Sequence, residues 1–130
     1  MKAETFVKLS SGWLLAAVIA CGGGRAGDAG EISQQEVLAF AGQAGTPLVL
    51  DVRSAEEFAG GHVPGAVNVS QEQVAARIGE LDPARGVVVY CERGPRAAKA
   101  ADVLRDAGFA VQHLTGDMSA WREQGLPIER

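Results

Sequence analysis

The 130-residue sequence has few cysteines and histidines and no excess of basic residues. Its Cys91 thiol, with His62 and His113 at scattered spacing, matches no zinc-binding pattern. The sequence carries 12 basic against 16 acidic residues and no basic stripe, so it lacks the charge with which nucleic-acid-binding proteins neutralise phosphates. We therefore expect no metal site and no nucleic-acid partner.

The apolar run near the N-terminus, Gly12 to Ala20, is too short to cross a bilayer as a helix. It follows Lys2 and Lys8 and ends in small residues, which is typical of an export signal. We therefore expect residues 1–20 to be a signal peptide.

The four residues VIAC that end at Cys21 resemble the lipobox of bacterial lipoproteins. This resemblance implies cleavage before Cys21 and attachment of diacylglycerol to its sulfur; an ordinary secretory signal and a buried helix with a chance cysteine are the alternatives. Residues 22–30 are rich in glycine and lack large apolar side chains, so we expect residues 21–30 to form a lipidated cysteine and a flexible tether. The domain would then lie in the cell envelope, anchored to a membrane by lipid and facing the periplasm or the exterior, with Cys91 as its single free thiol.

Residues 31–130 alternate helical and strand patterns without an internal repeat, which predicts one domain. Serine followed three residues later by glutamate or glutamine predicts the start of three helices, and continuous apolar runs predict strands that are buried on both faces. This alternation predicts an α/β fold with a mostly parallel central sheet and helices on both faces. We expect helices over residues 33–42, 54–61, 70–81, 95–108 and 119–125, and strands over residues 46–52, 66–69, 87–90 and 109–114.

The only expected free thiol lies between the strand over residues 87–90 and the helix that begins near Pro95. In parallel sheets, ligands bind beyond the carboxyl ends of the strands, and Cys91 follows such an end. Gly94 permits a positive φ, so the amides of residues 92–96 can converge into an anion-binding nest. The alternative is that Cys91 is a small buried residue that closes an apolar strand.

Electrostatics at this junction favour a thiolate, which is the nucleophilic form of cysteine. The positive pole of the helix, together with Arg93 and Arg96, stabilises negative charge on the sulfur. Glu92 opposes this effect if it points inward, and we expect its side chain to face solvent. The junction therefore predicts a reactive or anion-binding site.

Three segments resemble the rhodanese-like domain family. VLDVRSAEEFAGGHVPGAVNV, residues 49–69, resembles its amino-terminal signature; CERGPRA, residues 91–97, looks like its active-site loop; and LTGDMSAWREQGLPIE, residues 114–129, looks like its closing segment. The resemblance implies the three-layer rhodanese-like fold and a sulfurtransferase that carries sulfane sulfur as a persulfide on Cys91. Thiosulfate is a typical donor, and a thiol or cyanide is the acceptor.

The resemblance also implies roles for the loop. The backbone amides of residues 92–96 stabilise the persulfide, and Arg96, helped by Arg93, holds the small anionic donor. We expect the domain to need no cofactor and to be a monomer. The six residues from Cys91 to Arg96 have the sulfurtransferase length, whereas related phosphatases have a loop one residue longer. A non-catalytic persulfide carrier or partner-binding module at the cell envelope is the alternative function.

Two further residues are expected to support the loop from the end of the strand over residues 46–52. Asp51 is placed to bond to loop amides, and Arg53 is spaced to pair with Glu57 on the following turn. His62 is expected to be a hydrogen-bonding scaffold residue and not a base.

The closing segment, residues 114–129, has two further features. Trp121 is expected to fill the core under the last helix. The family often has two adjacent glycines where this chain has Gly116 and Asp117, and aspartate tolerates unusual turn backbone better than most residues.

Overall fold

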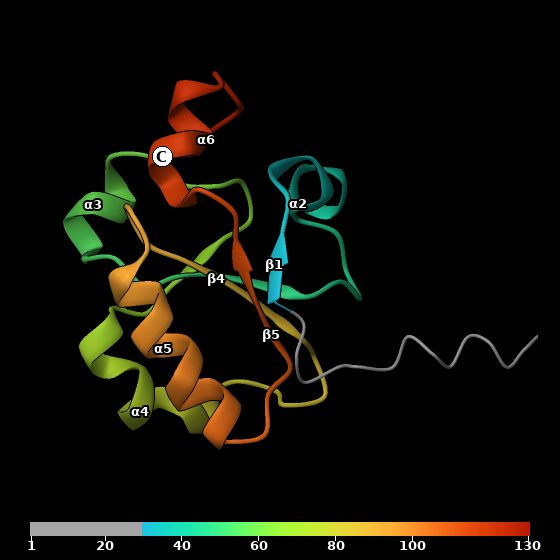
Figure 1. The fold of residues 1–130 in the computed structure, drawn as a ribbon, viewed down its shortest axis with the longest axis vertical. Coiled ribbons are helices and arrows are strands. Elements are labelled where there is room, and N and C mark those ends of the chain that lie inside the picture. Colours follow the sequence, from blue (N-terminus) through green and yellow to red (C-terminus); the bar gives the residue numbers. More distant parts are fainter. Residues whose placement is uncertain (1–29) are drawn as a thin grey trace, which may run out of the picture.

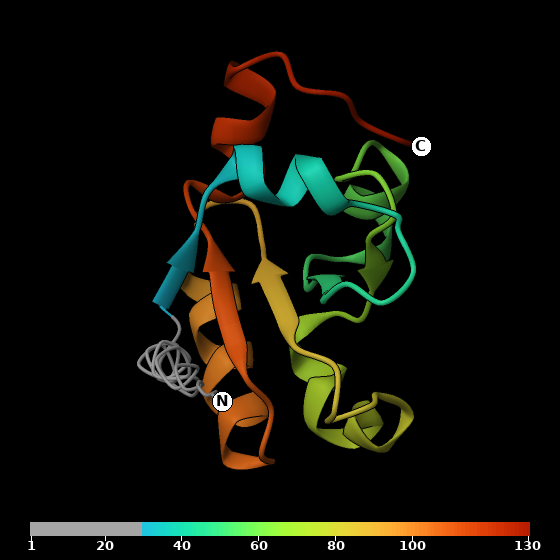
Figure 2. The same ribbon diagram turned by 90° about the vertical axis from the view of Figure 1, so that its right-hand side faces the viewer.

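Five short strands pair in parallel to form one sheet with the order β1-β5-β4-β2-β3. The structure is a computed structural model that describes residues 30–130, so the expected signal peptide and Cys21 lie outside the described residues. The strands are β1 (Gly30–Ile32), β2 (Leu48–Asp51), β3 (Val67–Asn68), β4 (Val87–Tyr90) and β5 (Val111–Leu114). Because all five run in the same direction, their carboxyl ends lie along one edge of the sheet (Figure 2).

Helices cover both faces of the sheet, as Figure 1 shows. They are α2 (Gln34–Phe40), α3 (Ala55–Ala59), α4 (Val74–Arg77), α5 (Pro95–Asp106) and α6 (Asp117–Glu123), with 3₁₀ turns η3 (Gln71–Gln73) and η4 (Ile78–Glu80) on either side of α4. One buried cluster joins the sheet to α4 and α5, and a second joins it to α2 and α6. The expected three-layer α/β fold with helices on both faces is therefore confirmed.

Alternation of side chains along β2 and β4 explains the two cores. Val49, Val88 and Tyr90 face the cluster that contains α2 and α6, whereas Leu50 and Val89 face the cluster that contains α5. A strand with apolar neighbours on both faces reads as a continuous apolar run, which is why the sequence predicted these two strands. Trp121 is fully buried in the cluster that joins the sheet to α2 and α6, as expected for a core residue.

The first two serine caps are present as predicted. Ser33 and Glu36 form a capping box at the start of α2, and Ser54 and Glu57 form another at the start of α3. The prediction of one continuous capped helix over residues 70–81 is wrong. Ser70 makes no side-chain capping bond there, and i→i+3 bonds tighten both ends into the turns η3 and η4, leaving α4 as a single turn.

Other boundaries differ by a few residues. Strand β1 was not predicted, and it begins at Gly30, which the sequence analysis placed in the tether; three residues are too few to show a pattern, and pairing with β5 holds them. Strand β5 begins two residues later than expected because the Phe109 amide bonds back to Leu104 at the end of α5. In the part of the chain that the structure describes, no helix has the length and apolar character needed to cross a membrane.

Candidate active site

The cysteine loop lies at the carboxyl edge of the sheet, between β4 and α5. Asp51 at the end of β2 is in register with Tyr90 at the end of β4, so the residues that follow these two strands are neighbours in space. The turn after β5 leads into α6 at the same edge. The site is therefore built where three chain segments leave the sheet, as expected for a ligand site in a parallel sheet.

Cys91 is almost fully buried, with 1% of its surface exposed, and the Gly94 amide donates a hydrogen bond to its Sγ atom over 3.0 Å. Gly94 has a φ of 127°, a conformation that residues with a Cβ rarely adopt. Glycine is thus required at the point where the backbone turns its amide toward the sulfur. A donor in this position stabilises negative charge on Sγ.

Other loop amides remain available to an anion. No acceptor within residues 30–130 takes a hydrogen bond from the amides of Glu92, Arg93, Arg96 or Ala97. The last two belong to the first turn of α5, where the helix leaves its amides unpaired and its positive pole lies. The loop therefore presents several N–H donors together with a helix pole.

Helix α6 fixes the orientation of the loop backbone. The Met118 amide donates to the Cys91 carbonyl over 3.0 Å, and the Ser119 amide donates to the Glu92 carbonyl over 3.1 Å. In a trans peptide the carbonyl and the following amide point in opposite directions. Because both carbonyls point toward α6, the amides of Glu92 and Arg93 point away from it, which leaves them free for a ligand.

The side chain of Glu92 does not face solvent, so that expectation is wrong. Arg53 donates to one of its carboxylate oxygens over 3.3 Å, and Arg122 on α6 donates to the other; 23% of the side chain is exposed. The two arginines neutralise the carboxylate and draw it away from the loop amides. Glu92 therefore fastens the loop to its surroundings instead of opposing negative charge on Cys91.

The expected partners of Asp51 and Arg53 are also wrong. The Asp51 carboxylate bonds to no loop amide: it accepts from the Arg53 amide at 2.9 Å and from the Arg53 guanidinium at 2.7 Å. Arg53 pairs with Asp51 and Glu92 and not with Glu57, and it also donates to the Gly61 carbonyl over 2.8 Å. Both side chains are buried, with 2% of Arg53 and none of Asp51 exposed.

This buried pair supports the loop from the end of β2. Burial lowers the pKa of Arg53, but the hydrogen bonds and the charge of Asp51 raise it to a net value above the ordinary one. The cation is thus held between one buried and one partly exposed carboxylate. It joins β2 to the cysteine loop.

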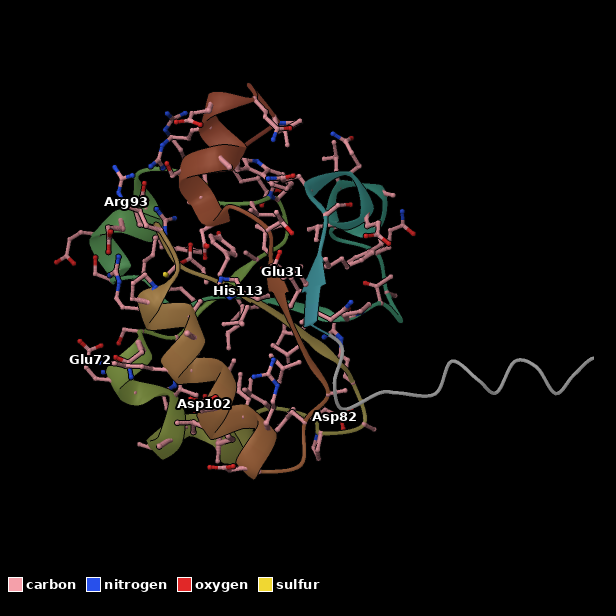
Figure 3. All side chains as sticks on the ribbon, in the orientation of Figure 1. Glu31, Glu72, Asp82, Arg93, Asp102 and His113 are labelled. Atoms are coloured by element: carbon pink, nitrogen blue, oxygen red, sulfur yellow. The ribbon has the colours of Figure 1, made fainter. Side chains whose placement is uncertain are left out.

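The two loop arginines have different surroundings. Arg96 donates to both carboxylate oxygens of Glu57 on α3, at 2.8 and 3.1 Å, and these bonds are the main reason that the pKa of Glu57 falls to about 2. Arg93 is exposed at the outer surface of the loop (Figure 3), and no carboxylate within residues 30–130 pairs with it. Arg93 is therefore the loop cation that is open to an incoming anion.

His62 is held by contacts with Phe58 and Glu129. Its Nδ1 atom is 2.8 Å from the Phe58 carbonyl, its ring stacks on Phe58 with centroids 3.7 Å apart, and its backbone pairs with Glu129. These contacts agree with a scaffold role and not with a base.

Sequence reasoning missed three residues at the site: Arg122, His113 and Asp117. Asp117 has a φ of 55°, and its Oδ1 atom accepts the Cys91 amide over 3.0 Å and lies 2.9 Å from His113 Nε2. The replacement of the second family glycine by aspartate was the available signal, since it places a carboxylate at a turn beside the loop. Among the described residues, no group of three His, Cys, Asp or Glu side chains is placed to hold a metal ion.

A buried cysteine in a loop of free amides, between a parallel strand and a helix, defines an α/β protein with a cysteine-centred loop at the carboxyl edge of its sheet. The chain belongs to the rhodanese-like domain family, because residues 33–124 match the sequence profile of the family described as "Rhodanese-like domain".

Similar proteins place the chain near named sulfurtransferases. It is 40% identical over 76 residues to thiosulfate sulfurtransferase GlpE of Shewanella oneidensis, which covers 58% of this chain and 75% of that protein. It is 41% identical over 90 residues to an HTH-type transcriptional regulator of Mycobacterium tuberculosis, covering 67% of this chain and only 39% of the regulator. A crystal structure of a protein from Lactobacillus plantarum superposes with a TM-score of 0.70 at 36% identity, covering 77% of this chain and 87% of that one.

Proposed function

We propose that the protein is a thiosulfate-type sulfurtransferase that carries sulfane sulfur on Cys91. The observation that carries the proposal is the Gly94 amide aimed at Sγ, in a loop whose neighbouring amides have no protein acceptor within residues 30–130. Sulfurtransferase relatives at 40% identity or below support the same class of reaction. No step in this reaction needs a cofactor.

The reaction has two displacement steps. The Cys91 thiolate attacks the outer sulfur of thiosulfate, the bond between the two thiosulfate sulfurs breaks, and sulfite leaves with the electron pair. The acceptor, a thiolate or cyanide, then attacks the terminal sulfur of the persulfide, and Cys91 leaves as a thiolate. A covalent enzyme intermediate of this kind gives ping-pong kinetics.

Loop residues act by stabilising negative charge. The Gly94 amide lies on Sγ, and the amides of Glu92 and Arg93 are oriented away from α6 and serve the terminal persulfide sulfur or the donor anion. Arg93 has the main role in attracting the donor, since Arg96 is engaged by Glu57. This reverses the order of importance expected from the resemblance.

The length of the loop favours sulfur over phosphate chemistry. From Cys91 to Arg96 the chain has six residues, and the turn closes with Gly94 only 3.0 Å from the sulfur. The related phosphatases have a longer loop, which surrounds a phosphate ester. A sulfane sulfur is the smaller cargo, and it fits the shorter loop.

The direct test is intact mass spectrometry of the chain from residue 22 onward after incubation with thiosulfate. Persulfide formation adds about 32 Da to the wild-type chain and nothing to Cys91→Ser. No gain in the wild type, or an equal gain in the variant, contradicts the proposal. In steady-state assays Arg93→Gln raises the KM for thiosulfate about tenfold, whereas Lys99→Gln, which removes an exposed cation from α5, leaves it unchanged.

A persulfide carrier or partner-binding module is the second candidate. The similarity to a transcriptional regulator favours it, because this chain matches only 39% of that longer protein. A carrier gains sulfur once but shows no repeated turnover with thiosulfate and cyanide. Multiple turnovers that are lost in Cys91→Ser therefore separate the enzyme from the carrier.

We further propose that Cys21 is lipidated and anchors the domain to a membrane of the cell envelope, with the domain as a monomer facing the periplasm or the exterior. The motif VIAC and the glycine-rich residues 22–30 support this proposal. A radiolabelled fatty acid is incorporated into the wild-type chain in bacteria and not into Cys21→Ser. Label that persists in the variant contradicts the anchor.

A further inference from the structure

We propose that Asp117 and His113 form a charge-compensated positioning pair beneath Cys91. This inference rests on the proposed function only for its effect on turnover. Asp117 fixes the backbone of the cysteine, and His113 cancels the negative charge that Asp117 brings to the site. The thiolate then forms beside a carboxylate without net repulsion from it.

The position of Asp117 depends on an uncommon backbone conformation. Its φ of 55° makes it the only non-glycine residue with a positive φ among residues 30–130. The preceding Gly116 also has a positive φ, of 76°, so two consecutive residues turn the chain from β5 into α6. Aspartate accepts this conformation more readily than most residues, and it adds a carboxylate that glycine lacks.

That carboxylate lies close to Cys91 and to Gly94, the residue whose amide donates to the sulfur. Its Oδ1 atom accepts the Cys91 amide over 3.0 Å. A Cβ atom built on Gly94 would lie 3.5 Å from its Oδ2 atom, and Gly94 is the residue whose amide bonds to Sγ. Asp117 therefore contacts the start of the loop directly and lies close beneath its turn.

Such a carboxylate needs a partner, because only 4% of Asp117 is exposed. A buried charge without a partner is costly, and a negative charge here also opposes a thiolate on the neighbouring cysteine. His113 on β5 supplies the partner: its Nε2 atom lies 2.9 Å from Oδ1 and 3.1 Å from Oδ2 of Asp117.

His113 has further charged neighbours on β1 and α5, whereas its partner on β4 is the apolar Val89. Glu31 on β1 is in register with His113 on the adjacent strand β5, Figure 3 labels both residues, and Arg105 lies on α5. The hydrogen bond that His113 donates to the Asp117 carboxylate is the main cause that raises the pKa of His113; burial lowers this pKa, the charge of Glu31 raises it and the charge of Arg105 lowers it. The balance of these contacts favours the imidazolium form, which cancels the charge of Asp117.

The test measures how fast a small neutral alkylating agent, iodoacetamide, modifies Cys91 at pH 7 in the chain from residue 22 onward. The rate follows the thiolate fraction and needs no sulfur transfer, so it remains informative if the proposed function fails. We compare wild type, His113→Gln, Asp117→Asn/His113→Gln and, as a control, Glu31→Gln. Glu31 faces His113 from the solvent side, where water screens its charge.

His113→Gln leaves the carboxylate uncompensated, and its alkylation rate falls at least about threefold. The double variant has no charge at either position, and its rate returns to within about twofold of wild type; Glu31→Gln also stays within that range. A wild-type rate in His113→Gln overturns the proposal. So does a double variant as slow as His113→Gln, since a purely structural role for the imidazole predicts no recovery.

Asp117→Gly tests the positioning role separately. Glycine adopts a φ of 55° without strain, so the variant removes the carboxylate and keeps the turn. We expect kcat with thiosulfate to fall about tenfold with little change in KM, because Cys91 loses the contact that orients its amide. Asp117→Asn keeps an acceptor oxygen and recovers most of kcat. An unchanged kcat in Asp117→Gly contradicts the positioning role.

Discussion

Replacement of Arg53 by methionine is the sharpest test of how the loop is supported. Methionine is uncharged and flexible and fills most of the volume of the arginine side chain, so the variant keeps most of the packing and removes every hydrogen bond of the guanidinium. In the structure that guanidinium contacts Asp51, Glu92 and the Gly61 carbonyl. The change therefore leaves the fully buried Asp51 carboxylate without its guanidinium partner, though still with the backbone amide of residue 53 as a donor, and the Gly61 carbonyl without its guanidinium donor.

The expected loss of stability follows from that burial. Asp51 has no exposed surface, and Arg53 has 2%. Breaking a buried ion pair by removal of one partner costs about 3–5 kcal/mol, because the remaining charge has neither water nor a counterion. Since a domain of this size is stable by only about 5–15 kcal/mol, Arg53→Met should be close to the limit of folding at 25 °C.

Urea unfolding followed by Trp fluorescence measures this loss. Arg77→Met is the matched control, because Arg77 is an exposed arginine that pairs with Glu80 on its own turn; we expect no measurable change there. The double variant Asp51→Asn/Arg53→Met also removes the unpaired negative charge of Asp51, and its free energy of unfolding is at least about 1 kcal/mol higher than that of Arg53→Met. A loss below about 1 kcal/mol in Arg53→Met, or no recovery in the double variant, refutes the reasoning.

Two further predictions concern the neighbours of the loop. Glu57→Gln keeps the capping box but loses the ion pair with Arg96. The pKa of Glu57 in the folded protein is about 2, below its ordinary value of 4.5. The ion pair therefore stabilises the fold fully above pH 4.5, and its contribution to stability disappears as the pH falls toward 2. After allowance for solvent at this partly exposed pair, the variant is about 1 kcal/mol less stable at pH 7, and the difference from wild type narrows in acid; a difference that does not change with pH contradicts this assignment. Gly116→Ala brings a Cβ within 2.4 Å of the Ala120 Cβ atom at a φ of 76°, whereas Gly108→Ala meets no atom within 4 Å at a φ of 96°. Gly108→Ala therefore loses only about 1 kcal/mol for its backbone, and Gly116→Ala loses clearly more in the same thermal unfolding assay; equal losses would show that the contact with Ala120 relaxes freely.

The sequence was sufficient for the parts of the fold that depend on local pattern. Strands β2 and β4 are continuous apolar runs because both of their faces are buried, and the serine caps of α2 and α3 are closed by residues three positions later. The loop from Cys91 to Arg96 was recognised for the same reason, since its glycine, cysteine and helix start are contiguous. These features need no knowledge of distant contacts.

The ion pairs of the site were not predictable in this way. Arg53 was assigned to Glu57 on the basis of helical spacing, but it pairs with Asp51 and Glu92, and Glu57 pairs with Arg96, 39 positions away. Each choice depends on how closely α3 and α6 approach the loop, which periodicity does not report. The same applies to strand β1: its three residues are too few to show a strand pattern, and the strand forms by pairing with β5.

The attachment of the cysteine loop to α6 has a consequence for the order in which the chain is made. The contacts that hold Cys91 and Glu92 come from Asp117, Met118, Ser119 and Arg122, about 26 to 30 positions later in the chain. When the ribosome has just added Cys91 to the chain, it has not yet synthesised helix α6, which contacts the loop. During translation the cysteine loop therefore lacks these contacts, and it acquires them only when the C-terminal segment has been made and docks.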